Sequence, residues 1–135
     1  MRLTLQTHFD GEWHHAATLE LKDDAAGFQG ASIVDYDLDY FVTVASAEFA
    51  AGKTVRDHRA LSVRYPADLE NRYSRSWPPF LLDLMPQGHA RRKLAEHLSL
   101  AEGSRASDLP LLLRSASGGI GNIRIKEAAE AEIER

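Results

Sequence analysis

The first half of the chain alternates between apolar and polar positions, as strands do when one face of a sheet is buried. Leu3 and Leu5 lie on one side of the first alternating run. On the second run one side carries Trp13, His15, Ala17, Leu19 and Leu21. Asp10-Gly11 stands between the runs and predicts a type I′ turn, because both central residues of that turn need a positive φ. The pattern predicts an antiparallel hairpin over residues 2–22 with one buried and one solvated face.

The middle of the chain gives fewer signals. The residues Asp-Asp-Ala-Ala-Gly at 23–27 predict a turn, and a third strand is expected near 30–36. Residues 37–60 fit a strand, a short helix or a loop. Alternation returns over 61–66 and predicts a strand that ends at Pro66. The residues that follow predict a loop as far as Trp77-Pro78-Pro79.

From Pro78 onward the apolar positions follow the period of helices. Pro78-Pro79 predicts the start of a short helix over 80–85, because proline is tolerated in a first turn. Residues 87–98 predict a clearer helix, and one side of it carries Ala90, Leu94 and Leu98.

The last third of the chain predicts a helix, a strand and a charged helical segment. Ser107-Asp108 is expected to cap the helix, and Gly118-Gly119 to end it. The strand is expected over 120–126, and the charged segment over 127–135 has Ile133 as its one large apolar residue. Together the elements predict an α+β fold: an N-terminal antiparallel sheet packed with a helical C-terminal half, in one domain over residues 1–135.

Composition narrows the class of protein. The 135 residues carry a formal net charge of −4, which gives no general attraction to phosphate backbones, so no direct nucleic-acid binding is expected. No apolar run approaches the ~20 residues of a membrane helix, so no membrane partner is expected. Cysteine is absent, which excludes disulfides and thiolate metal sites and suits the cytoplasm.

Two glycine-containing stretches are similar to nucleotide loops without meeting their requirements. Gly52-Lys53-Thr54 matches the end of a phosphate-binding loop, but Ala47 stands where the first glycine is needed. Residues 118–121, Gly-Gly-Ile-Gly, lead from a predicted helix into a predicted strand, the reverse of the order in a dinucleotide site. A polar turn and a helix end are therefore the predictions for these stretches.

The polar side chains do not form a recognisable catalytic or metal-binding motif. His14 and His15 are neighbours on a strand and point to opposite faces, so they cannot share a metal ion. Asp35, Asp37 and Asp39 lack the glycine and the distal glutamate of a calcium loop. We therefore expect no catalytic residue, no metal and no cofactor in this chain.

Two segments are candidates for contacting a partner. Trp77 and Phe80 flank a rigid Pro-Pro pair and fit either core packing or, for an exposed Trp77, a binding hot spot. Arg91 and Arg92, followed by Lys93, fit either the solvated side of a helix or a contact with an acidic partner or phosphates.

Three runs together resemble the N-terminal domain of the HipA family of serine/threonine kinase toxins. These runs are Ala60-Leu61-Ser62-Val63-Arg64-Tyr65-Pro66, Pro79-Phe80-Leu81-Leu82-Asp83-Leu84-Met85-Pro86-Gln87-Gly88 and Arg91-Arg92-Lys93-Leu94-Ala95. The family carries a Leu-Ser…Pro segment, then Phe-x-x-x-Leu-Leu-Pro-Glu-Gly, then Arg and Leu-Ala. The resemblance spans nearly the whole chain and gives family-motif roles to Pro66, Phe80, Leu84, Pro86, Gly88 and Leu94. Gln87 departs from the more common glutamate, and residues 120–125 indicate a divergent branch.

The resemblance implies a role in a bacterial toxin–antitoxin system. In the family this domain precedes a kinase core that binds ATP and Mg²⁺, and that core is expected to lie beyond Arg135. The implied partners are the kinase core, in cis or as a separate chain, and a cognate DNA-binding antitoxin. The expected function is a non-catalytic docking and regulatory domain. The alternatives are a freestanding subunit that binds and restrains the kinase, and an unrelated small enzyme, which the missing motifs disfavour.

Overall fold

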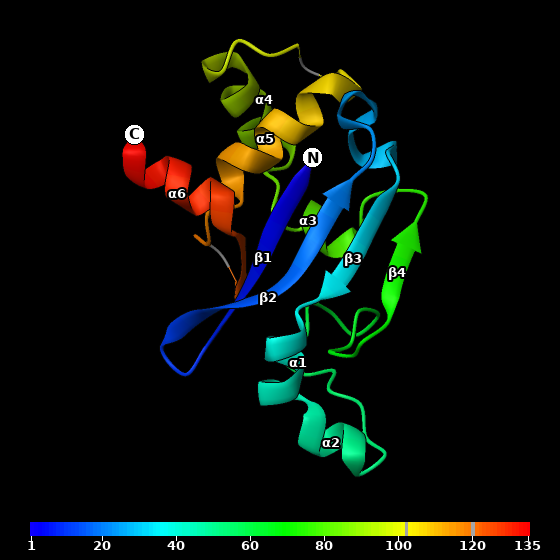
Figure 1. Ribbon diagram of the computed structural model, residues 1–135. Coiled ribbons are helices and arrows are strands. Elements are labelled where there is room, and N and C mark those ends of the chain that lie inside the picture. Colours follow the sequence, from blue (N-terminus) through cyan, green and yellow to red (C-terminus); the bar gives the residue numbers. More distant parts are fainter. Residues whose placement is uncertain (102, 120) are drawn as a thin grey trace.

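The computed structural model describes residues 1–101, 103–119 and 121–135. Its centre is an antiparallel sheet with strand order β4-β3-β2-β1-β5 (Figure 1). The strands are β1 (Arg2–Phe9), β2 (Glu12–Leu21), β3 (Ser32–Tyr36), β4 (Asn71–Ser74) and β5 (Ile123–Ile125). The sheet and the helices around it confirm the predicted α+β class.

The predicted hairpin is present. Asp10 and Gly11 connect β1 to β2 with φ values of 52° and 79°, as a type I′ turn requires. The third strand is confirmed as β3, which pairs with β2.

A bulge in β2 changes which residues face the core. Leu5 pairs with Ala17 but Gln6 pairs with His15, so Ala16 is the extra residue and the alternation shifts by one. Ala17 lies on the buried face, whereas His15 is exposed. The expectation that Trp13 and His15 share the buried face of Leu19 was therefore wrong.

The opposite face of the sheet is open and largely polar, as expected. Trp13 lies on this face, where the guanidinium carbon of Arg124 stands 4.4 Å from the centre of its ring. Arg124 Nε also donates a hydrogen bond to Gln6 Oε1 at 2.7 Å. The indole and the guanidinium together cover this end of the face and bury Gln6.

The helices gather at the two ends of the sheet and behind it (Figure 1). The 3₁₀ helix η1 (Asp24–Gln29) replaces the turn predicted at 23–27. In the open segment 37–60, α1 (Leu38–Val44) and α2 (Ser46–Ala50) are short helices, and turns and loop follow over 51–60. The C-terminal half forms α3 (Pro79–Leu82), α4 (Gly88–His97), η2 (Arg105–Ser107), α5 (Asp108–Ser115) and α6 (Lys126–Glu134). None of the helices described is long and apolar enough to cross a membrane.

The strand predicted over residues 61–66 is wrong. This segment is a turn with one isolated bridge, between Ser62 and Tyr65. The Tyr36 hydroxyl explains the difference, because it accepts the Leu61 N–H at 2.8 Å and donates to the Tyr65 carbonyl at 2.5 Å. A side chain thus satisfies backbone groups that would otherwise need a neighbouring strand. The fourth strand, β4, lies instead in the polar segment that was expected to be a loop.

The predicted helices of the second half are present, but two are shorter than expected: α3 ends at Leu82 instead of residue 85, and α5 ends at Ser115, before Gly118. Ser107 makes no side-chain cap on α5, and the Asp108 carboxylate forms contacts outside that helix. The last strand, predicted from residue 120, begins at Ile123, and Ile120 lies outside the described residues.

Candidate functional site

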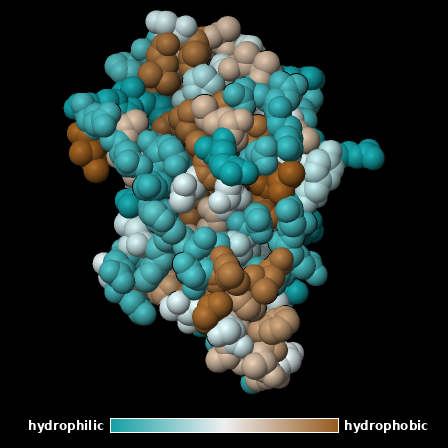
Figure 2. Space-filling model, in the orientation of Figure 1, coloured by the Kyte–Doolittle hydropathy of each residue, from teal (hydrophilic) through white to brown (hydrophobic). Residues whose placement is uncertain are grey.

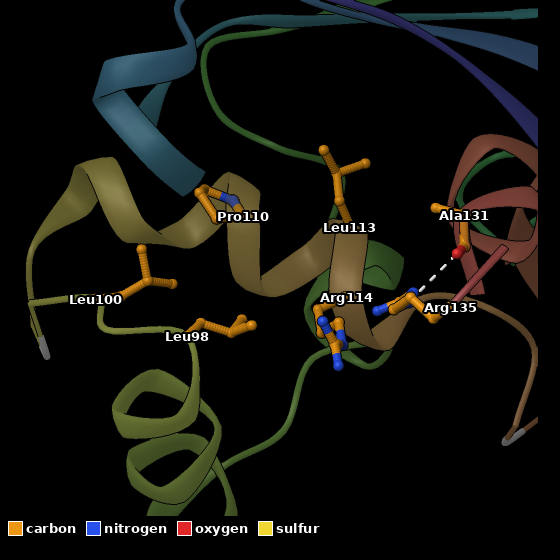
Figure 3. Close-up of a pocket in the computed structure, with 7 residues that line it drawn as sticks. All are labelled: Leu98, Leu100, Pro110, Leu113, Arg114, Ala131 and Arg135. Carbon is orange, nitrogen blue, oxygen red and sulfur yellow. Dashed lines mark hydrogen bonds between the residues drawn. The ribbon is translucent and has the colours of Figure 1, made fainter.

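An apolar groove of about 430 Å³ lies between the C-terminal side of α4, α5 and α6 (Figure 3). Its walls are Leu98, Leu100, Pro110, Leu113, Arg114, Ala131 and Arg135.

The sequence of α5 explains why an apolar surface remains outside the core. This helix has apolar side chains on more than one face, and Leu109, Leu111 and Leu112 are buried against the rest of the domain. Leu113 is only half-buried and, with Leu98, lines the groove. The residues after α4 therefore cover only part of the surface that α5 offers.

The charges at the groove are basic. Arg114 and Arg135 belong to its lining, and none of the other lining side chains is charged. Figure 3 draws both arginines on the side of the groove away from Leu100. Within the part of the chain that the structure describes, neither guanidinium forms an ion pair; Arg135 Nε donates to the Ala131 carbonyl at 3.3 Å. The arrangement fits an apolar segment that carries acidic residues.

Trp77 is not at this surface. Its side chain is 3% exposed and belongs to the hydrophobic core, while its backbone N–H donates to the Phe28 carbonyl at 2.9 Å. Of the two interpretations of Trp77, core packing is the one that the structure supports. The expectation that Trp77 directly contacts a partner is corrected accordingly.

Arg91 and Arg92 differ sharply although they are neighbours. Arg91 Nη2 lies 2.5 Å from Asp108 Oδ1, a carboxylate whose side chain is 3% exposed. Asp108 Oδ2 accepts the Phe28 N–H at 3.0 Å. Arg91 thus holds the fold together, whereas Arg92 is exposed on α4 and remains a candidate contact.

The family-motif residues build the region between the sheet and α4. Pro66 and Phe80 are buried, and the Phe80 ring meets the edge of Tyr65 with 5.3 Å between ring centres. Leu84 and Pro86 are half-buried and line a small cavity of about 160 Å³. Gly88 begins α4 with a φ of +54°.

Leu94 completes this set. It is half-buried and packs against the core. The six motif residues therefore contribute to packing or to the start of α4, and none of them lines the groove.

Sequence reasoning missed the groove itself. Leu98 was placed on the apolar side of its predicted helix with Leu94, and Leu100, Leu113 and Arg114 were not singled out. The signal that could have found them is the run Leu-Pro-Leu-Leu-Leu at residues 109–113, which is too apolar for a helix with one buried side.

No metal-binding group was found among the residues described: no three side chains of histidine, aspartate or glutamate gather closely enough to hold an ion. Gly52 lies in the turn after α2 with a φ of +73°, in agreement with the predicted polar turn.

The pronounced pKa shifts lie away from the groove and have structural causes. Hydrogen bonds from Arg59 lower the pKa of Asp57 to about 2, and burial raises the pKa of Tyr36. Arg59 also donates to the Val44 carbonyl and pairs with Glu48, both at 3.2 Å. Through these contacts Arg59 ties the loop after α2 to the end of α1 and to α2.

Comparison with known proteins gives one family. The family model described as HipA N-terminal domain matches residues 42–126. No curated protein and no solved structure matches. The matched segment runs from within α1 to the first residue of α6, and it includes all of α4 and α5.

Proposed function

Because the chain belongs to the HipA N-terminal domain family, we propose that it is a docking and regulatory domain without a catalytic centre of its own. Its partner is a HipA-like kinase core, either continuous with it or supplied as a separate chain. The setting is a bacterial, cytoplasmic toxin–antitoxin system, in which a DNA-binding antitoxin is a second partner. ATP and Mg²⁺ belong to the kinase core.

The observation that carries the proposal is the basic-rimmed apolar groove. Leu98, Leu100 and Leu113 leave an apolar surface in solvent, which a monomeric domain rarely keeps without a binding partner. Two of its walls, formed by α5 and by Leu98 and Leu100 just after α4, lie within the matched segment. The groove is therefore the surface that we assign to the kinase core.

The experiment measures binding to the kinase core, produced as a separate chain, by calorimetry. Leu98→Ser with Leu113→Ser should weaken binding at least about tenfold, because apolar anchors dominate such interfaces. Val63→Ser is the matched control, since Val63 is exposed and lies far from the groove. Circular dichroism checks that both proteins remain folded.

Unchanged affinity of the folded groove variant would contradict the proposed surface. A separate titration with ATP and Mg²⁺ tests the absence of a catalytic centre: no saturable binding is expected, and micromolar binding by this chain would overturn that part of the proposal. Co-purification of the unfused domain with the kinase would identify it as a separate subunit.

A further inference from the structure

A second apolar surface lies at the other end of the sheet, on α1 and α2. Leu38, Val42 and Phe49 are 60%, 54% and 64% exposed. We call these three residues, together with the exposed Leu69, which lines a hollow with Phe49, the α1–α2 patch. Figure 2 shows apolar side chains gathered at the lower end of the molecule, where Figure 1 places α1 and α2.

The core does not account for these side chains. Helix α1 already buries Tyr40, Phe41 and Val44, and Leu38 and Val42 stand on its other side, one turn apart. Helix α2 has no buried residue, yet it carries Phe49. The two helices thus expose large apolar side chains that the core leaves in solvent.

The patch is partly preformed. The Phe49 ring meets Phe41 edge to face, with 5.6 Å between ring centres, which limits its rotation. Beside it lies a hollow of about 400 Å³ that Phe49 and Leu69 line together. A side chain from a partner could enter this hollow without rearrangement of the backbone.

Two unpaired carboxylates stand beside Leu38. Asp37 and Asp39 flank it; both are exposed, and neither forms an ion pair within the described ranges of the chain. Lys53 lines the hollow beside Phe49 and is the basic group on that side. Nearby carboxylates, by contrast, are neutralised: Glu48 pairs with Arg59, and Asp68 pairs with Arg72.

We propose that the α1–α2 patch binds a basic amphipathic helix of a partner protein. Apolar residues at i, i+3 or i+4 and i+7 would cover Leu38, Val42 and Phe49, and lysine or arginine residues beside them would face Asp37 and Asp39. The uncompensated carboxylates disfavour an anionic membrane or a nucleic acid. They also disfavour a second copy of the same patch, because like charges would then meet.

The proposal goes beyond the docking function assigned to the groove. Figure 1 places α4 and α5 at the opposite end of the sheet from α1 and α2. The groove beside α5 has Arg114 and Arg135 in its lining. The groove therefore favours an acidic partner and the α1–α2 patch a basic one. Substitutions in one surface should abolish binding of its partner without affecting the other.

The test uses a labelled synthetic helix of about 18 residues, roughly five turns, with leucines along one side and lysines elsewhere. Fluorescence anisotropy should show saturable binding to the full chain. Val42→Ser with Phe49→Ser should weaken it at least about tenfold. Asp37→Asn with Asp39→Asn should weaken it and reduce its salt dependence between about 50 and 300 mM.

Three controls separate the outcomes. Val63→Ser and the groove variant Leu98→Ser with Leu113→Ser should leave peptide binding unchanged. A peptide of the same composition with scrambled leucines, and one with glutamate for lysine, should bind at least about tenfold more weakly. Equal binding of either peptide, or full affinity of a folded Val42→Ser, Phe49→Ser protein, would overturn the proposal. So would light scattering that shows a dimer which those two substitutions dissociate, because the patch would then bind a second copy.

Discussion

Arg91 and Asp108 form an ion pair of 2.5 Å that joins α4 to the start of α5. The same carboxylate accepts the Phe28 N–H and so reaches η1 as well. Gly27 permits this approach: a Cβ at that position would stand 2.8 Å from Asp108 Cγ, and its φ is +59°. Three segments that are distant in the sequence thus meet at one buried carboxylate.

Arg91→Ala is expected to lower the free energy of unfolding by about 1–3 kcal/mol. Loss of a partner from a fully buried pair costs about 3–5 kcal/mol, and Arg91 is partly solvated. Urea denaturation measures the change. Arg92→Ala is the matched control, with an expected effect within about 0.5 kcal/mol because Arg92 is exposed. Equal effects of the two substitutions would refute the structural role of Arg91.

Trp77→Ala is expected to lower the free energy of unfolding by about 3–5 kcal/mol, because the indole is in the core and its removal leaves a cavity. Thermal denaturation followed by circular dichroism measures the loss. Tyr73→Ala removes an exposed aromatic side chain from β4 and should have a much smaller effect. A Trp77→Ala protein as stable as the parent would place the indole outside the core.

Gly118→Ala is expected to destabilise the domain by at least about 1 kcal/mol. The φ of Gly118 is +100°, and a Cβ there would lie 2.8 Å from the Trp13 ring. Gly119→Ala is the control, because no atom lies within 4 Å of the added Cβ. The urea midpoint of the Gly118→Ala protein should lie clearly below that of the Gly119→Ala protein. Equal midpoints would mean that Trp13 does not pack on this turn.

Asp57 should give stability that is lost in acid. Its folded-state pKa is about 2, below the ordinary 3.8, so its contribution is complete above that ordinary value and declines as the pH falls from about 4 to about 2. Asp57→Asn should therefore lower the free energy of unfolding at neutral pH, and the difference from the parent should shrink over this range. The half-exposed pair limits the effect to below about 1 kcal/mol.

Denaturation at a series of pH values measures this difference. Asp35→Asn serves as the control, since Asp35 is exposed, and its effect should stay within about 0.5 kcal/mol at each pH. A difference for Asp57→Asn that grows toward acid would have the wrong sign for the Arg59 contact.

The parts of the fold that were predicted are those that local chemistry determines. Asp10-Gly11 defined the hairpin, and Pro79 is the first residue of a helix, as predicted. The end predicted at Gly118 was late, because α5 ends at Ser115. Two features had no local signal. The bulge at Ala16 follows from how β2 fits against β1, and the turn at 61–66 depends on the hydroxyl of Tyr36, a residue 25 positions before Leu61.

The surfaces were harder to predict than the elements. The sequence identified Trp77 as an aromatic residue suited to a core or an interface, but its burial depends on tertiary packing. The exposure of Leu38, Val42 and Phe49 depends in the same way on which side of α1 the sheet occupies. Residue type indicated which side chains are suited to packing. Only the three-dimensional arrangement showed which of these apolar side chains stay exposed.

The order of the strands implies that the segment matched by the family cannot form the sheet alone. β4 and β5 are the two edge strands, and the three strands between them come from the first 36 residues. The segment 42–126 matched by the family contains both edges and none of the strands that they pair with. A peptide limited to that segment should be disordered, and addition of residues 1–41 as a second peptide should restore structure by complementation.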